Sequence, residues 1–84
     1  MNLSQAVLSE HAALQMAKRQ INATDVNCVL SAPEQVLEVR AGRVVAQGMA
    51  SGYLLRVFVD VDRIPAEVVT VYRTNKIEKY RSRV

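Results

Sequence analysis

Residues 53–62 read YLLRVFVDVD, and the alternation of side chains in this stretch decides the fold class. Every second residue from Tyr53 to Val61 is apolar, and the intervening positions still include Leu54 and Phe58. A two-residue period of this kind is typical of a β-strand. Because a strand that is apolar on both faces usually lies inside a sheet, we predict a central strand here.

Turn residues on both sides of this strand indicate a meander. Gly42 and Gly52 each end a short turn, and a third turn follows residue 62. The periodicity between the turns predicts three further strands, over residues 35–40, 43–49 and 67–74. Strands joined by such short turns run antiparallel to each other.

Helical signals precede the sheet. Ser9 is a helix-capping residue, and the good helix formers after it end at a basic pair, which predicts a helix over residues 10–19. Asn22, followed three residues later by an acid, predicts a second helix over residues 23–31. Pro33 stops that helix.

The expected fold class is therefore α+β, with two N-terminal helices packed on a four-stranded, mainly antiparallel meander sheet. The 84 residues, half of them hydrophobic, are expected to form a single domain, 1–84. One cysteine excludes an internal disulfide. No apolar run approaches the roughly 18 to 20 residues of a membrane span, and the first residues lack the pattern of a signal peptide, so we expect a cytoplasmic protein without a membrane contact.

Positive charge is concentrated at the C-terminal end. From Arg73 onward five cations face one carboxylate, a net of +4, whereas residues 1–72 carry six cations and seven carboxylates. The basic tail, residues 75–84, is expected either to continue the sheet or to form a short helix. Arg73, Lys76 and Arg81 are candidate phosphate-binding residues on this surface. The alternative is a solvated tail that binds polyanions weakly.

Hydroxyl groups and one histidine are the candidate catalytic groups. Thr70, Tyr72 and Thr74 alternate along the last predicted strand and would line one of its faces, opposite Val69 and Val71. If those valines face the helices, the hydroxyls lie on the opposite surface of the sheet.

His11 is the only histidine, and its ordinary pKa suits proton transfer near neutral pH. The alternative, which the sequence alone favours, is a histidine at the rim of a helix without a functional role. No second histidine or cysteine stands at a metal-ligand spacing, so we expect no metal and no cofactor.

Tyr80 stands between Lys79 and Arg81, a pattern that suits stacking on an unpaired RNA base while cations bind phosphates. Arg56 on the central strand either extends this surface or pairs with a nearby carboxylate such as Asp60. The sequence leaves both alternatives open.

The order of these motifs resembles a bacterial family of small domains of unknown function. The resemblance rests on Ser9-Glu10-His11-Ala12, Met16, Arg19, Ile21, Asp25-Val26, Pro33-Glu34, Gly42-Arg43, Leu55-Arg56-Val57, Val69-Thr70-Val71-Tyr72-Arg73-Thr74 and Lys79-Tyr80. That family is similar in layout to the barnase, EndoU, colicin and RelE group of toxin-like ribonucleases. The chain departs from the family at Gln20, where glycine is frequent, and His11 has no second imidazole beside it.

The resemblance implies a metal-independent endoribonuclease in which the 2′-hydroxyl attacks the adjacent phosphate. It implies His11 as base or acid, with Arg19 and Arg56 as phosphate clamps. Thr70 or Thr74 would donate hydroxyl hydrogen bonds, and Lys79 with Tyr80 would stabilise charge and stack on the substrate.

The implied partners are RNA and an antitoxin-type or immunity-type protein. The alternative function is a non-catalytic module that binds RNA or an acidic protein. A homodimer formed through an exposed strand edge is also expected from the valine-rich sheet.

Overall fold

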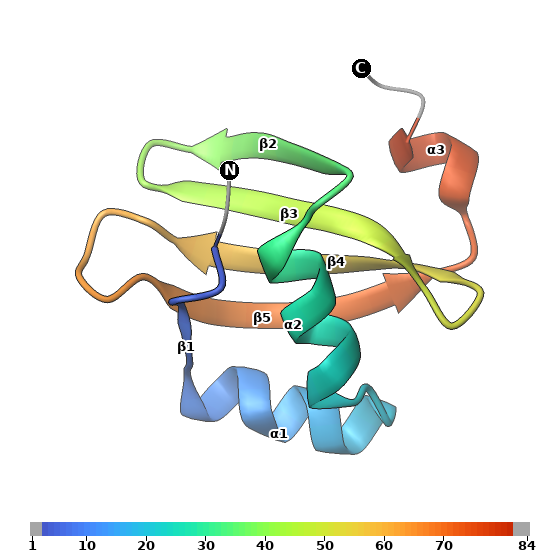
Figure 1. The fold of residues 1–84 in the computed structure, drawn as a ribbon, viewed down its shortest axis with the longest axis horizontal. Helices are drawn as coiled ribbons and strands as arrows, with labels where there is room; N and C mark the ends of the chain where they lie inside the picture. Colours follow the sequence, from blue (N-terminus) through green and yellow to red (C-terminus); the bar gives the residue numbers. More distant parts are fainter. Residues whose placement is uncertain (1–2, 82–84) are drawn as a thin grey trace.

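The computed structural model describes residues 3–81 and has the expected α+β class, with eight helices and strands in that range (Figure 1). In chain order they are β1 (Val7–Leu8), α1 (Glu10–Arg19), α2 (Ala23–Ser31), β2 (Gln35–Arg40), β3 (Arg43–Ala50), β4 (Tyr53–Asp60), β5 (Glu67–Thr74) and α3 (Ile77–Arg81).

The sheet has one strand more than the sequence predicts, and it is mixed. Its strand order is β1-β5-β4-β3-β2, so that β2 to β5 form the predicted antiparallel meander. The short strand β1 pairs in parallel with β5 through Val7 and Leu8. The central strand β4 ends at Asp60, because the chain turns there toward β5.

The two longer helices begin at the capping residues that the sequence indicates. The Ser9 hydroxyl accepts a hydrogen bond from the Ala12 amide at 3.0 Å, and the Asn22 side chain accepts one from the Asp25 amide at 2.8 Å. Gln20 ends α1 with φ +56°, a left-handed conformation that glycine favours. The turn between the helices therefore has a left-handed backbone conformation although position 20 is not a glycine. Within residues 3–81, no helix has the length and apolar character needed to cross a bilayer.

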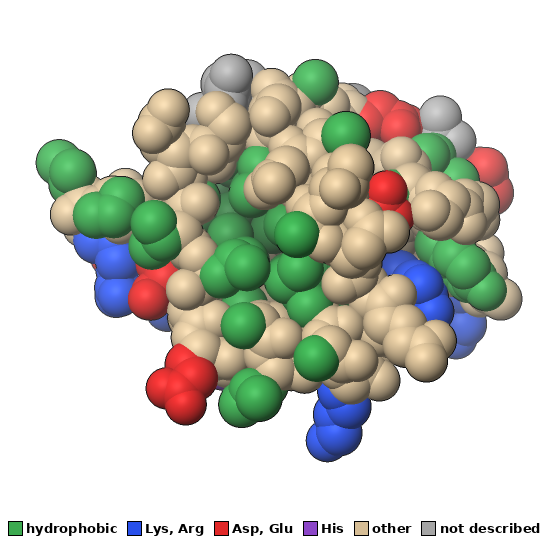
Figure 2. Space-filling view, turned by 60° about the horizontal axis from the view of Figure 1, so that its bottom comes forward, with side chains coloured by type: hydrophobic (Ala, Val, Ile, Leu, Met, Phe, Trp, Pro, Cys, Tyr) green, Lys and Arg blue, Asp and Glu red, His purple; other side chains and the backbone are tan. Residues whose placement is uncertain are grey.

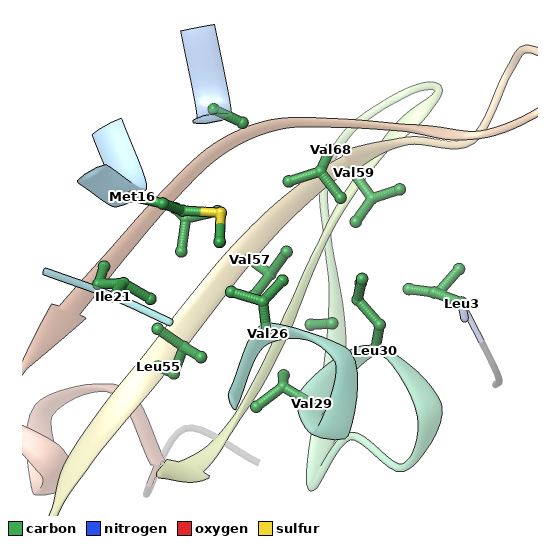
Figure 3. Close-up of a cluster of buried hydrophobic side chains, with 13 residues drawn as sticks. Leu3, Met16, Ile21, Val26, Val29, Leu30, Leu55, Val57, Val59 and Val68 are labelled. Atoms are coloured by element: carbon green, nitrogen blue, oxygen red, sulfur yellow. The ribbon is translucent and has the colours of Figure 1, made fainter. Parts of the chain in front are cut away.

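The core lies between one face of the sheet and the two helices (Figure 3). In Figure 1, α2 crosses this face while α1 runs alongside β5. The core side chains are almost all aliphatic: Leu3, Ala12, Met16, Ile21, Val26, Val29, Leu30, Ala46, Leu55, Val57, Val59, Val68 and Val71. Since Leu55, Val57 and Val59 point into this core, alternation places Leu54, Arg56 and Phe58 on the opposite surface, which we call the outer face.

A β-bulge in β5 changes the predicted facing of its side chains. Val59 pairs with Val68 and Phe58 pairs with Thr70, so Val69 is the extra residue. Val68 and Val71 are both fully buried in the core, whereas Val69 is only partly buried. The bulge therefore interrupts the predicted alternation of this strand and brings Val68 into the core. Tyr72 and Thr74 pair with Arg56 and Leu54, so they lie on the outer face.

The C-terminal tail forms a short helix where it is described. The amide of Lys76 donates to the Thr74 hydroxyl at 3.0 Å, which turns the chain out of β5 and into α3. In Figure 1, α3 lies at the end of the sheet opposite the connection between β4 and β5. Residues 82–84 and the side chain of Arg81 lie outside the described part of the chain.

Candidate functional site

Four polar side chains form a continuous row across the outer face. Gln35, Gln47, Arg56 and Tyr72 come from β2, β3, β4 and β5, and each is the direct cross-strand partner of the next. The Gln47 amide donates to Gln35 Oε1 at 2.6 Å. Arg56 Nε donates to Gln47 Oε1 at 2.9 Å, and Arg56 Nη1 donates to the Tyr72 hydroxyl at 2.6 Å. The sheet register therefore fixes the Arg56 guanidinium at the middle of this row.

The direction of these hydrogen bonds follows from the chemistry of arginine. Because a guanidinium can only donate, Gln47 must turn its oxygen toward Arg56 and its NH₂ group toward Gln35. Gln47 is fully buried, so both ends of its amide need partners. A mispaired amide at this depth would cost about 1–3 kcal/mol. Gln47 thus holds Arg56 in one orientation.

The C-terminal helix places Tyr80 over this row. The Arg56 guanidinium lies 4.2 Å from the centroid of the Tyr80 ring, and the Gln47 NH₂ group also donates to the Tyr80 carbonyl at 3.3 Å. Lys79 Nζ lies 5.4 Å from the centroid of the same ring. Cations this close to an aromatic ring are attracted to its face. Arg56 is therefore held by hydrogen bonds along the row and by an aromatic ring against its guanidinium.

The two tyrosines beside Arg56 have pKa values shifted in opposite directions. Burial raises the pKa of Tyr72, and its hydrogen bond with Tyr80 acts in the same sense. That hydrogen bond and the charges of Lys79 and Arg56 lower the pKa of Tyr80. Divergent shifts in neighbouring titratable groups are the pattern expected of an acid and a base in one site.

A pocket of about 580 Å³ adjoins the row at the edge of β5. Its lining comes from α1 and β5: Gln15, Arg19, Thr70, Tyr72 and Arg73. Thr70 donates a hydrogen bond to Gln15 Oε1, and Arg19 Nη1 donates to the Val71 carbonyl at 2.9 Å. We call this the α1–β5 pocket. Tyr72 belongs to both the pocket and the row, so the two are continuous.

A group of carboxylates lies at the end of the sheet where β4 connects to β5. Arg43 donates to Asp60 at 2.6 Å, and Arg63 pairs with Asp60, Asp62 and Glu67. The hydrogen bond to Arg43 holds the pKa of the Asp60 carboxyl below its usual range, and the same bond raises the pKa of Arg43. Of the ion pairs formed within residues 3–81, none involves Arg19, Arg56 or Arg73.

Figure 2 views the molecule from the side of α1. Lys and Arg side chains lie at the left, lower and right-hand margins of this view, around a centre of hydrophobic side chains, and those on the left lie beside Asp or Glu side chains. Among the described residues, three arginines that form no ion pair lie around Tyr72: Arg19, Arg56 and Arg73. Such a cluster attracts anions.

The structure brings some of the predicted site residues together and leaves others apart. Arg56, Lys79 and Tyr80 meet on the outer face, and Arg19, Thr70 and Arg73 meet in the α1–β5 pocket. The Thr74 hydroxyl accepts a hydrogen bond from the Lys76 amide in the turn before α3. The side chain of Arg81 lies outside the described residues.

His11 is exposed in the first turn of α1, one helical turn before Gln15. It does not line the pocket, and no hydrogen bond within the described residues joins it to the other predicted residues. The amide of nearby Ser9 bonds to the Val68 carbonyl, four residues before Tyr72 on β5.

Sequence reasoning missed Gln47 and its place in the row. Gln47 is the only polar side chain between Val44 and Ala50, in a strand that is otherwise apolar or glycine. A lone glutamine in such a strand, in register with a central arginine, is the signal that indicates a buried polar network.

The fold and this surface define a small α+β domain with an arginine and tyrosine cluster on the outer face of its sheet. The chain belongs to the family described as Domain of unknown function (DUF4258), which matches residues 8–73. The match includes the α1–β5 pocket and the row across the sheet, and it ends before α3. No curated protein and no solved structure matches the chain.

Proposed function

We propose that this domain is a metal-independent endoribonuclease that binds single-stranded RNA on its outer face and cleaves it by attack of a 2′-hydroxyl. The observation that carries the proposal is the Arg56 guanidinium between Tyr72 and Tyr80, with no carboxylate of the described residues paired to it. An arginine in this setting can stabilise the extra negative charge that develops on a phosphate during attack.

The two tyrosines supply the proton transfers. In its deprotonated form, which its lowered pKa favours, Tyr80 takes the proton of the 2′-hydroxyl as general base. The 2′-oxygen then forms a bond to the adjacent phosphorus, and the bond from phosphorus to the 5′-oxygen breaks. Tyr72, whose pKa is raised, donates its proton to the departing 5′-oxygen.

The products are a 2′,3′-cyclic phosphate and a 5′-hydroxyl. After the reaction Tyr80 carries the extra proton and Tyr72 lacks one. The hydrogen bond between their hydroxyls returns the proton to Tyr72, so the pair is ready for another turnover.

Analysis of RNA ends tests the reaction. Incubation with a single-stranded RNA in the presence of a chelator should produce 2′,3′-cyclic phosphate ends. Arg56→Gln should lower the cleavage rate by roughly 10²- to 10³-fold, the magnitude found when one charge-stabilising donor is removed. Lys18→Gln removes the same charge from an exposed position on α1 and should leave the rate unchanged. Intact RNA after incubation with the wild-type chain would refute the proposal.

A non-catalytic RNA-binding module is the second candidate, because Arg56 already has hydrogen-bond and stacking partners within the chain. A guanidinium held in this way can position a phosphate without any reaction. This candidate predicts RNA affinity that falls with salt, by a slope near −0.7 for each neutralised phosphate, without new RNA ends.

Protein partners are part of the proposal. An antitoxin-type or immunity-type partner would have to cover Arg19, Arg56 and Arg73, so we expect it to present carboxylates to them. A homodimer would form through β2, which is the outermost strand on its side of the sheet. Sedimentation at two protein concentrations distinguishes a dimer from a monomer.

A further inference from the structure

We propose that the α1–β5 pocket is a second phosphate subsite, which binds the phosphate next to the reacting one on a single-stranded RNA. The inference deepens the proposed function and rests on it for the identity of the ligand. It predicts that the smallest substrate recognised in full carries two phosphates, one at Arg56 and one in the pocket.

The hydrogen-bonding groups of the pocket are mainly donors. Gln15 Oε1 accepts both from the Thr70 hydroxyl and from the Val71 amide at 3.3 Å. Because the Val71 amide can only donate, the orientation of the Gln15 side chain is fixed, and its NH₂ group remains as a donor. The Thr70 proton is used in the same contact, so Thr70 positions Gln15 and does not donate to a ligand.

The two arginines of the pocket keep most of their donors for a ligand. Arg19 uses Nη1 for the Val71 carbonyl, and Arg73 makes one long hydrogen bond of 3.5 Å, to the Gln20 carbonyl. A guanidinium has five N–H donors, so each retains several. Arg73 also lies 4.9 Å from the centroid of the Tyr53 ring, which limits where its guanidinium can lie. Two guanidinium groups and an amide NH₂ group suit an oxyanion such as phosphate.

Size and position agree with a phosphate of a nucleic-acid strand. A volume of about 580 Å³ falls within the roughly 300–1,000 Å³ of small-molecule sites. Tyr72 lines the pocket and accepts a hydrogen bond from Arg56, so one side chain separates the two subsites. A strand that passes over Tyr72 would place successive phosphates on its two sides.

Dinucleotides with one or two phosphates test the subsite. The probes are 2′-O-methyl UpU, which cannot undergo the cleavage reaction, and the same dinucleotide with an added 5′-phosphate or 3′-phosphate. Dissociation constants are measured by calorimetry at one fixed, low salt concentration. For the wild-type chain, at least one of the two phosphorylated forms should bind about tenfold more tightly than UpU.

Substitutions of the two arginines test whether the pocket is the source of this gain in affinity. Arg19→Gln and Arg73→Gln should each remove most of it, whereas Lys18→Gln, which removes the same charge from an exposed position nearby, should keep it. Arg73→Gln is the safer test of the pair, because Arg19 also holds the backbone of β5.

The outcomes separate the subsite from the reaction. A chain that produces cyclic phosphate ends but shows no gain from the added phosphate overturns the subsite and leaves the ribonuclease intact. A gain that persists in both arginine variants also overturns the subsite. A gain that is lost in both variants, from a chain that leaves RNA intact, supports the subsite and refutes only the reaction. No measurable binding of any dinucleotide overturns the subsite.

Discussion

The guanidinium of Arg56 lies 4.2 Å from the centroid of the Tyr80 ring and joins the middle of the sheet to the C-terminal helix. The two residues are far apart in sequence, and two features bring them together. The register of β3 and β4 places Gln47 beside Arg56, and the Gln47 amide holds the Tyr80 carbonyl. The position of the site thus depends on a buried glutamine that does not itself lie at the surface.

The buried amide of Gln47 should therefore contribute to stability. Gln47→Leu removes the acceptor of Arg56 and the donor to Gln35 and Tyr80. The unpaired groups should lower the free energy of unfolding by about 1–3 kcal/mol, measured by urea denaturation. Gln5→Leu makes the same substitution at an exposed position and should change it by less than about 0.5 kcal/mol. If the two variants had equal free energies of unfolding, the hydrogen bonds of the row across the sheet would make no net contribution to stability.

The cap of α1 should be worth about 1 kcal/mol. Ser9→Ala removes the hydroxyl that accepts from the Ala12 amide and leaves that amide without its partner. The midpoint of thermal unfolding should fall by roughly 4–8 °C, as expected for about 1 kcal/mol in a domain of this size. Ser31→Ala, at the exposed last residue of α2, is the matched control and should shift the midpoint far less.

Acid should destabilise the chain partly through Asp60. The pKa of its carboxyl is lowered in the folded state, mainly by the hydrogen bond from Arg43. The ionised carboxylate therefore stabilises the fold above about pH 4, the ordinary value for aspartate, and this contribution disappears as the pH falls through the lower folded pKa.

Asp60→Asn should accordingly be less stable than wild type at pH 7 and should lose less stability between about pH 4 and pH 2. Thermal unfolding midpoints across this range measure the effect. The matched control is Asp62→Asn, which changes a neighbouring, more exposed carboxylate that lies 4.0 Å from Arg63. If the unfolding midpoints of wild type and Asp60→Asn fell in parallel as the pH is lowered, the Asp60 carboxylate would not be the stabilising group.

Local signals account for most of the fold that the sequence predicts. Ser9 and Asn22 cap the helices, and the two-residue periods between turns mark the strands. Strand β1 has no such signal, because two residues have no period and their partner strand begins about sixty residues later. The bulge at Val69 is likewise a property of the backbone, and it moved Val68 into the core where simple alternation predicts the opposite.

The site was predictable in its residue types but not in its arrangement. The excess of cations near Tyr80 indicates phosphate binding, and Arg56 was among the candidates. Which cations form ion pairs depends on packing at the two ends of the sheet. Asp60 pairs with Arg43 and Arg63, whereas Arg56 has no carboxylate partner among residues 3–81. The place of Tyr80 above Arg56 depends on how α3 turns back after Thr74, which no local pattern specifies.

The most direct test of the central claim is the single-turnover rate of RNA cleavage by Tyr80→Phe in the presence of a chelator. Tyr53→Phe is the matched control, because it removes one hydroxyl from an exposed tyrosine and keeps its ring beside Arg73. Tyr80→Phe should cleave roughly 10²- to 10⁴-fold more slowly than wild type, while Tyr53→Phe should cleave at the wild-type rate. Cleavage that survives Tyr80→Phe but is lost in His11→Ala would refute Tyr80 as the base and place the base in the first turn of α1.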